Sequence, residues 1–196
     1  MSNTKEKKKE KLKAGEYGYI DDHKKRQLFK IILWVIAILA VVLGGWLYFG
    51  TRINLVTLIG IFLVLPAAKA VVNYAVIMRY HTGNREKYEK IKGMLNDHFL
   101  VLSDLVITRY EGSMGLEIVV IHGGNLFAYV PEQKASVKEI RDYLAESVQY
   151  AGSEAIPSVF TDFGKFEAFI KKVSDSKTEI GKKDQLILKD LMSKAV

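Results

Sequence analysis

The chain has 196 residues, of which 49% are hydrophobic and 26% are charged, and its formal net charge is +7. Cysteine is absent, which excludes disulfides, thiolate metal sites, iron–sulfur clusters and cysteine nucleophiles. Residues 29–83 contain four Lys or Arg and no Asp or Glu, whereas all 22 acidic residues lie elsewhere. This segregation of charge predicts a membrane protein with a separate soluble part.

The excess of positive charge lies outside the C-terminal region. Residues 1–28 carry nine basic and five acidic side chains, whereas residues 84–196 carry 16 basic and 17 acidic ones. Nucleic-acid binding requires a basic patch on a folded domain, so this distribution argues against it. It predicts instead that the N-terminal Lys and Arg attract anionic lipid of the inner leaflet; the residues are Lys7, Lys8, Lys9, Lys24, Lys25 and Arg26.

The first predicted membrane span covers residues 28–49. This run of 22 residues contains one charge, Lys30. At about 1.5 Å per residue it exceeds the roughly 30 Å hydrocarbon core. A secretory signal peptide is the alternative, but its apolar region would be only about 7 to 15 residues long, and no A-x-A-like site follows this run. We therefore expect an uncleaved helix, preceded by a basic disordered tail over residues 1–27.

A second apolar run, residues 54–78, follows after a very short linker. The linker forces the second helix to return antiparallel, so residues 28–80 are expected to form a hairpin. Pro66 removes one backbone hydrogen bond and is expected to kink or break the second helix near Leu65.

The segment from Pro66 to Lys69 is the predicted packing site of the hairpin. Ala67 and Ala68 offer small side chains against which a second copy of the chain or a partner membrane protein could pack closely. Lys69 has two interpretations: its long stem carries the ammonium to the headgroups, or it is a functional charge inside the membrane. Its position in the final third of the span favours the first interpretation.

The distribution of Lys and Arg also predicts the orientation of the hairpin. Nine basic residues precede the first span and only Arg52 lies in the turn, whereas several follow the second span: Arg79, Arg85, Lys87, Lys90 and Lys92. Because Lys and Arg favour the cytoplasmic side, we expect both termini in the cytoplasm and a multi-pass anchor in the cell (plasma) membrane.

Residues 84–196 are expected to form one cytoplasmic α/β domain, so that the whole chain belongs to the α+β class. Apolar residues recur there at helix or strand spacing, separated by glycines, prolines and helix caps. The first three strands, joined by short glycine-containing turns, are expected to form an antiparallel meander. The expected order is helix, three strands, helix, strand, helix, helix, over residues 84–98, 99–110, 116–122, 126–130, 136–152, 155–162, 163–173 and 182–194.

The hairpin resembles a known group of proteins. The stretch NLVTLIGIFLVLPAAKAVVN (residues 54–73), the basic N-terminus, the length and the α/β region are similar to small uncharacterised two-span membrane proteins of Gram-positive anaerobic bacteria. The resemblance implies a membrane location and a bacterial source. It implies no established function.

The order α-β-β-β-α-β that follows the hairpin is similar to the core of the PD-(D/E)xK nuclease-like fold, which includes membrane-tethered members. In that fold, an acid on the second core strand and a (D/E)-x-K set on the third hold a divalent metal and assist a water. Glu117 could supply the first acid, but residues 125–129 contain neither the second acid nor the lysine. The resemblance therefore implies a degenerate nuclease site.

The remaining polar residues form no recognisable catalytic motif. Ser103, Asp104 and His122 are the residue types of a hydrolytic triad, but no G-x-S-x-G context surrounds them, and adjacent strand residues point to opposite faces. The histidines lack metal-binding spacing and the glycines form no phosphate loop, so we expect no catalytic, metal or cofactor residue. The leading hypothesis is a non-enzymatic, membrane-tethered interaction or regulatory module. The alternative is a membrane-anchored divergent nuclease-like or hydrolytic enzyme.

Overall fold

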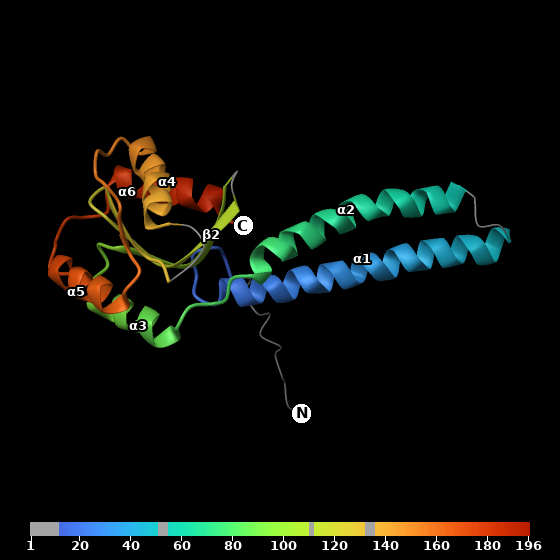
Figure 1. Ribbon diagram of the computed structural model, residues 1–196, viewed down its shortest axis with the longest axis horizontal. Coiled ribbons are helices and arrows are strands. Elements are labelled where there is room, and N and C mark those ends of the chain that lie inside the picture. Colours follow the sequence, from blue (N-terminus) through green and yellow to red (C-terminus); the bar gives the residue numbers. More distant parts are fainter. Residues whose placement is uncertain (1–11, 51–54, 110–111, 132–135) are drawn as a thin grey trace, which may run out of the picture.

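The computed structural model describes residues 12–50, 55–109, 112–131 and 136–196. Two long helices, α1 (Tyr19–Phe49) and α2 (Leu55–Met78), lie side by side as a hairpin that extends away from a domain of helices and strands (Figure 1). The mixed content of helix and sheet confirms the expected α+β class. Both helices are long and apolar enough to cross a membrane.

Pro66 does not break α2, which runs without interruption from Leu55 to Met78. Of the two effects expected near Leu65, a kink or a break, the break is therefore wrong. Proline removes a single hydrogen bond, and α2 also packs along α1. Gly60 lies so close to Val42 of α1 that an added Cβ would be 2.9 Å from its Cγ2, and Ala70 is buried in the domain-ward half of α2.

The four strands form one sheet in the order β1-β2-β3-β4, in which β1, β2 and β3 are antiparallel and β4 runs parallel to β3. The expected meander is confirmed. β2 begins earlier than expected, because Gly112, with a φ of 143° that suits glycine, already pairs with Arg109. β4 is shorter than expected. The strands are β1 (Leu100–Arg109), β2 (Gly112–His122), β3 (Asn125–Tyr129) and β4 (Ser158–Phe160).

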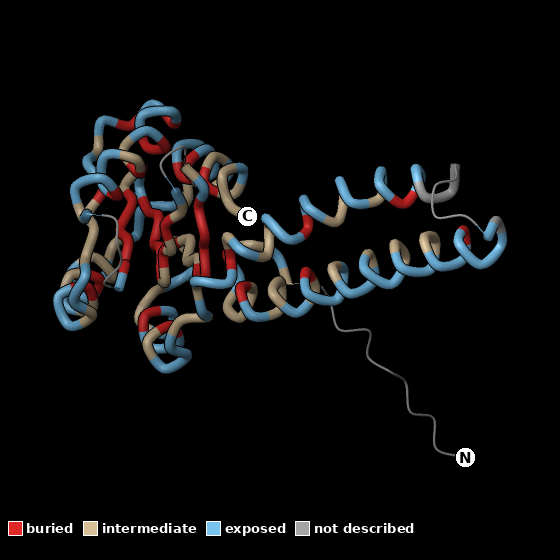
Figure 2. Tube along the Cα trace, turned by 45° about the vertical axis from the view of Figure 1, so that its right-hand side comes forward, coloured by how far each residue is buried: buried red, intermediate tan, exposed pale blue. Residues whose placement is uncertain are grey.

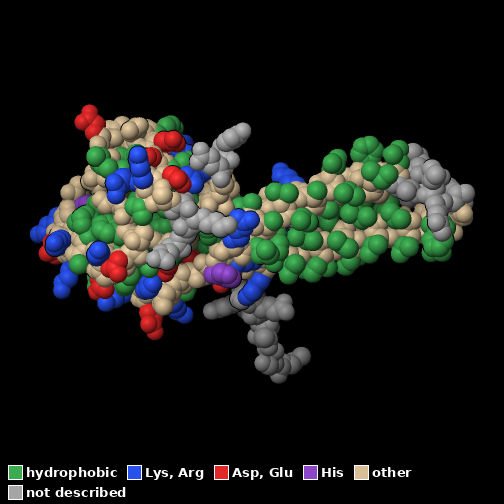
Figure 3. Space-filling model, viewed as in Figure 1, with side chains coloured by type: hydrophobic (Ala, Val, Ile, Leu, Met, Phe, Trp, Pro, Cys, Tyr) green, Lys and Arg blue, Asp and Glu red, His purple; other side chains and the backbone are tan. Residues whose placement is uncertain are grey.

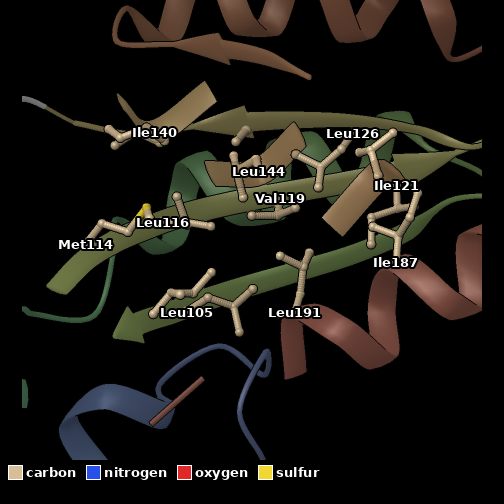
Figure 4. Packing of buried hydrophobic residues seen from close by; sticks show 14 of the residues in the cluster. Leu105, Met114, Leu116, Val119, Ile121, Leu126, Ile140, Leu144, Ile187 and Leu191 are labelled. Carbon is tan, nitrogen blue, oxygen red and sulfur yellow. The ribbon is translucent and has the colours of Figure 1, made fainter. Parts of the chain in front are cut away.

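Helices cover both faces of the sheet, with the core between them (Figures 1 and 2). One face packs against α4 (Val137–Tyr150) and α6 (Lys182–Lys194), and Figure 4 shows Ile187 and Leu191 of α6 beside the strands. The other face packs against α3 (Arg85–Met94) and α5 (Phe163–Val173), through Ile91, Phe166 and Ile170. The helices after the hairpin thus lie close to where the sequence pattern predicts them.

The N-terminal boundary of the hairpin differs from the expectation. α1 begins at Tyr19 and not at the start of the apolar run, and its first turn packs on β1 through Ile20, which is buried. Before it, Gly15 forms an antiparallel bridge with Ser103 of β1. The expected disordered tail over residues 1–27 is therefore wrong for the part that the structure describes. The segment is rich in Lys and Glu, which is typical of disordered tails. Its few side chains that contact the domain, such as Ile20, form no recognisable sequence pattern.

In both β1 and β2, the alternation of side chains between the two sheet faces shifts by one residue. The shift lies at neighbouring positions of the two strands, Asp104 and Glu117. Leu102 and Leu105 of β1 pack into the same core cluster although their positions differ by three, and the same is true of Leu116 and Val119 of β2. A regular strand places only residues an even number apart on one face. The shift occurs at Asp104, whose φ of 55° is the only positive value among the described non-glycine residues. Val106, which packs against Ile20 and Ile77 at the base of the hairpin, lies between Leu105 and Ile107 of this cluster and therefore faces the opposite side of the sheet.

Candidate functional site

A cavity of about 750 Å³ lies at the junction of the hairpin and the domain. This volume is within the range of about 300 to 1,000 Å³ that is typical of small-molecule sites. We call it the junction cavity. Its wall consists of the α2–α3 connection, the facing parts of β1 and β2, and single residues from α1, α3, α4 and the end of β3; the polar members are Arg79, His81, Thr82, Asn84, Lys87, Asp104, Arg109, Ser113, Glu117 and Glu139.

Asp104 forms the inner wall of the junction cavity and joins the two ends of the hairpin. Its Oδ2 accepts the backbone N–H of Gly18 at 2.7 Å, and its Oδ1 accepts that of Gly83 at 3.0 Å. Gly18 directly precedes α1, and Gly83 lies in the connection that follows α2. One carboxylate on β1 therefore ties both the entry and the exit of the hairpin to the sheet.

Burial raises the pKa of Asp104, which is only 1% exposed. The N–H groups of Gly83 and Gly18 stabilise the charged form and act in the opposite direction, but the loss of water is the larger effect. The carboxyl group therefore holds its proton to a higher pH than an ordinary aspartate. Such a group in the wall of a cavity is typical of functional sites, although structural networks also produce it.

Beside Asp104, on the neighbouring strand β2, the wall of the junction cavity is also tied to the start of α3. Glu117 of β2 accepts the backbone N–H of Asn84 at 3.0 Å through Oε1. Asn84 in turn caps α3, since its Oδ1 accepts the N–H of Glu86 at 2.8 Å. The Nζ of Lys87 donates to the Tyr129 hydroxyl at 3.0 Å, and this hydrogen bond raises the pKa of Lys87. Glu117, the acid singled out by the nuclease resemblance, thus lies in this wall.

Two arginines line the outer part of the junction cavity. Arg109, at the end of β1, lies 3.8 Å from the Glu139 carboxylate, and its side chain is only 13% exposed. Its Nε is buried and has no hydrogen-bond partner among the residues that the structure describes. Arg79, directly after α2, is exposed and forms no hydrogen bond or ion pair within the described part of the chain. Donor groups therefore remain unused on this side of the cavity.

The hairpin residues predicted to pack against a partner lie away from the junction cavity. Pro66 and Ala67 are half-buried, whereas Ala68 and Lys69 are exposed on α2. Of the basic residues predicted to attract lipid, Lys24, Lys25 and Arg26 lie in the first turns of α1, and Arg26 forms an ion pair with Asp22 at 3.2 Å. The others, Lys7, Lys8 and Lys9, lie outside the described residues.

The hydrolytic triad types are not brought together. Ser103 Oγ is 3.4 Å from Oδ1 of Asp104, so the expectation that these neighbours diverge is wrong, because the positive φ of Asp104 interrupts the alternation. His122 lies near the start of β1, stacked on Phe99 at 3.9 Å between ring centroids. Its Nε2 is 2.8 Å from the Ser176 hydroxyl. Within the described residues, no group of three or more His, Asp or Glu is placed to hold a metal ion.

The sequence pattern does not reveal the junction cavity, because its wall comes from connections and strand ends that are distant along the chain. One local signal existed: Asp104 is the only acidic residue in the strand LVLSDLVITR and lies between apolar segments. A buried aspartate must be hydrogen-bonded or paired, so it points to partners from elsewhere in the chain. Those partners are backbone groups of two glycines, which leave no trace in side-chain spacing.

No protein family, no curated protein and no solved structure matches the chain. The resemblances to the two-span bacterial group and to the nuclease-like core therefore stay predictions. Function must be argued from the hairpin and the junction cavity.

Proposed function

We propose that the protein is an integral two-pass membrane protein that holds its α+β domain against the cytoplasmic face of the cell membrane as an interaction or regulatory module. The observation that carries the proposal is the exposed apolar surface of the hairpin (Figure 3). A core helix of a soluble protein would be mostly buried. In contrast, only 6% of the residues in the most apolar stretch of α1 are buried, and only 17% of those in the corresponding stretch of α2. Exposing such a surface to water is strongly unfavourable, whereas lipid covers it.

The shape of the chain is compatible with a hairpin in the membrane and a domain at its surface. α1 and α2 extend together away from the domain, so lipid can surround them while the domain stays in water (Figures 1 and 3). The apolar surface begins at Leu28 and Phe29, above the charged first turns of α1. Lys24 and Lys25 would then lie at the level of the headgroups, where each attracts anionic lipid by about 1 kcal/mol.

Asp104 supports the regulatory part of the proposal. Because its carboxylate binds both Gly18 and Gly83, a change in the separation or tilt of the two helices acts directly on β1. The same residue lines the junction cavity, so occupation of the cavity acts on the hairpin as well. Coupling between two sites needs a shared element of this kind.

Single cysteines test the orientation, since the chain contains none of its own. Thr51→Cys reports on the turn of the hairpin, Ser2→Cys on the N-terminus and Ser193→Cys, at an exposed position of α6, on the domain. With a membrane-impermeant maleimide, we expect labelling of Thr51→Cys in intact cells and of the other two only after lysis. Labelling of Ser193→Cys in intact cells would place the domain outside and refute the proposed orientation. Recovery of all three variants in the soluble fraction would refute membrane insertion.

The enzymatic alternative has one specific point in its favour, which is the position of Glu117 in the wall of the junction cavity. Its Oε1 already accepts a backbone N–H, so a structural role accounts for the side chain as well. A Glu117→Gln variant separates the two roles. If the domain acts as a divergent metal-dependent nuclease, this variant folds normally and loses hydrolysis of a DNA substrate in the presence of Mg²⁺. If wild-type protein shows no such hydrolysis, the nuclease alternative fails.

A further inference from the structure

Within the described part of the chain, both arginines in the wall of the junction cavity have donor groups without a partner. Each acidic side chain in its wall already has a partner: Asp104 accepts two backbone N–H groups, Glu117 accepts one, and Glu139 lies beside Arg109. The arginines keep unused donors. Arg109 approaches Glu139 through Nη2 only, and its Nε is buried with no partner among the described residues; Arg79 has no hydrogen bond or ion pair within the same part of the chain.

A buried donor without a partner is unfavourable, and its occurrence in a cavity points to an acceptor that is bound there. Guanidinium groups favour carboxylate and phosphate oxygens, to which they form short charge-assisted hydrogen bonds. Arg79 follows α2 and Arg109 ends β1, so the two groups reach the cavity from different elements. A tetrahedral phosphate presents oxygens in several directions and can accept from both, whereas a carboxylate has two oxygens in one plane.

The rest of the wall fits an organic phosphate better than a free ion. Ile20, Tyr80 and Leu116 add apolar surface, and the volume of about 750 Å³ holds much more than one phosphate group. The Tyr80 hydroxyl is anchored to Ser113 Oγ at 3.0 Å, which fixes its ring in the wall. A ligand of this kind carries a phosphate at one end and carbon groups at the other.

We propose that the junction cavity binds a phosphate ester, with Arg79 and Arg109 as the residues that contact the phosphate. Two kinds of molecule carry such a phosphate group: a phospholipid, in its headgroup, and a soluble phosphate ester. The position of the cavity, beside the base of an exposed apolar hairpin, brings both within reach. The inference deepens the proposed regulatory role, because Asp104 connects this wall to both helices.

The test uses the purified whole chain in a detergent without phosphate groups, so that its outcome does not depend on orientation in the membrane. Binding of dihexanoyl phosphatidic acid and of glycerol 3-phosphate is measured by titration calorimetry. We compare wild type with Arg79→Gln, with Arg109→Gln and with the control Arg85→Gln. Arg85 is a neighbouring, well exposed arginine whose side chain is not part of the cavity wall.

We expect saturable binding of one ligand per chain that weakens about tenfold in Arg79→Gln and in Arg109→Gln and is unchanged in Arg85→Gln. If only the phosphatidic acid binds in this way, the source is a lipid headgroup; if glycerol 3-phosphate binds equally well, it is a soluble ester. No saturable binding of either, or equal weakening in all three variants, overturns the proposal. Circular dichroism and gel filtration of each variant separate lost binding from lost folding, and Arg109→Lys replaces Arg109→Gln if the latter does not fold.

Discussion

The backbone N–H groups of Gly18 and Gly83, which flank the two ends of the hairpin, bind different oxygens of the same buried carboxylate. Gly18 has a φ of 88°, so its own conformation is one that glycine adopts readily. The carboxylate belongs to Asp104, the described non-glycine residue with a positive φ. Two residues with a positive φ, Gly18 and Asp104, thus meet at the point where hairpin and domain join.

Asp104→Asn is expected to destabilise this junction. Asparagine tolerates the φ of 55° and has nearly the same size, but its amide offers one acceptor oxygen to two N–H donors. One donor is left unpaired in a buried place, at a cost of about 1–3 kcal/mol. The free energy of unfolding in detergent checks the value, with exposed Asp175→Asn as the control. An equal effect of both substitutions would mean that the two hydrogen bonds contribute nothing to stability.

The pH dependence of stability isolates the carboxyl group of Asp104. Burial raises its pKa above the ordinary value of 3.8, so the folded protein keeps this proton to a higher pH than the unfolded chain. The protonated carboxyl group makes its full contribution to the free energy of unfolding when the pH is below the ordinary pKa. This contribution is lost as the pH rises through the pKa of the folded state. Between these two values, wild type should therefore lose stability relative to Asp104→Asn as the pH rises. Parallel unfolding curves over about pH 3 to pH 8 test this; a gain of wild-type stability over the same interval would show that hydrogen bonding outweighs burial.

Gly115→Ala should disturb the contact between the end of α2 and β2. A Cβ at this position would lie 2.6 Å from Cδ1 of Tyr80, so the ring must move out of the cavity wall. Forced overpacking of this kind costs about 1–3 kcal/mol. Gly93→Ala in α3 is a matched control, because nothing lies within 4 Å of its added Cβ, and alanine favours helices by about 1 kcal/mol. We expect the melting temperature to fall for Gly115→Ala and to rise or stay constant for Gly93→Ala; the reverse order would contradict the close approach of Tyr80.

Residue patterns predict the fold of this protein better than its site. The bounds of α5 and α6 agree with expectation, because their ends carry local signals, such as the carboxylate of Asp162 that accepts the N–H of Lys165 at 2.8 Å. The start of α1 does not agree, because Gly18 at its N-cap supplies no side-chain hydrogen bond and Ile20 is followed at once by two aspartates, so no local signal marks the start. The junction cavity is still harder to predict. Its central hydrogen bonds join Asp104 to backbone groups, which the sequence does not reveal. The shift in strand alternation at Asp104 also means that a period of two assigns the following side chains to the wrong face of the sheet.

Ala68→Leu tests whether the hairpin associates with a second copy of the chain or with a partner helix. Ala68 is exposed on α2, so in a lipid environment its small side chain is free to contact a neighbouring helix closely. A leucine keeps the apolar character but holds the two backbones apart. Ala75→Leu, at another exposed position of α2, makes the same change in volume outside the predicted packing site. We expect in-membrane crosslinking to fall severalfold in Ala68→Leu and to remain in Ala75→Leu. Since neither side chain is buried within the chain, a loss confined to Ala68→Leu would reflect association and not folding, whereas unchanged crosslinking in both would remove the segment from Pro66 to Lys69 as a packing site.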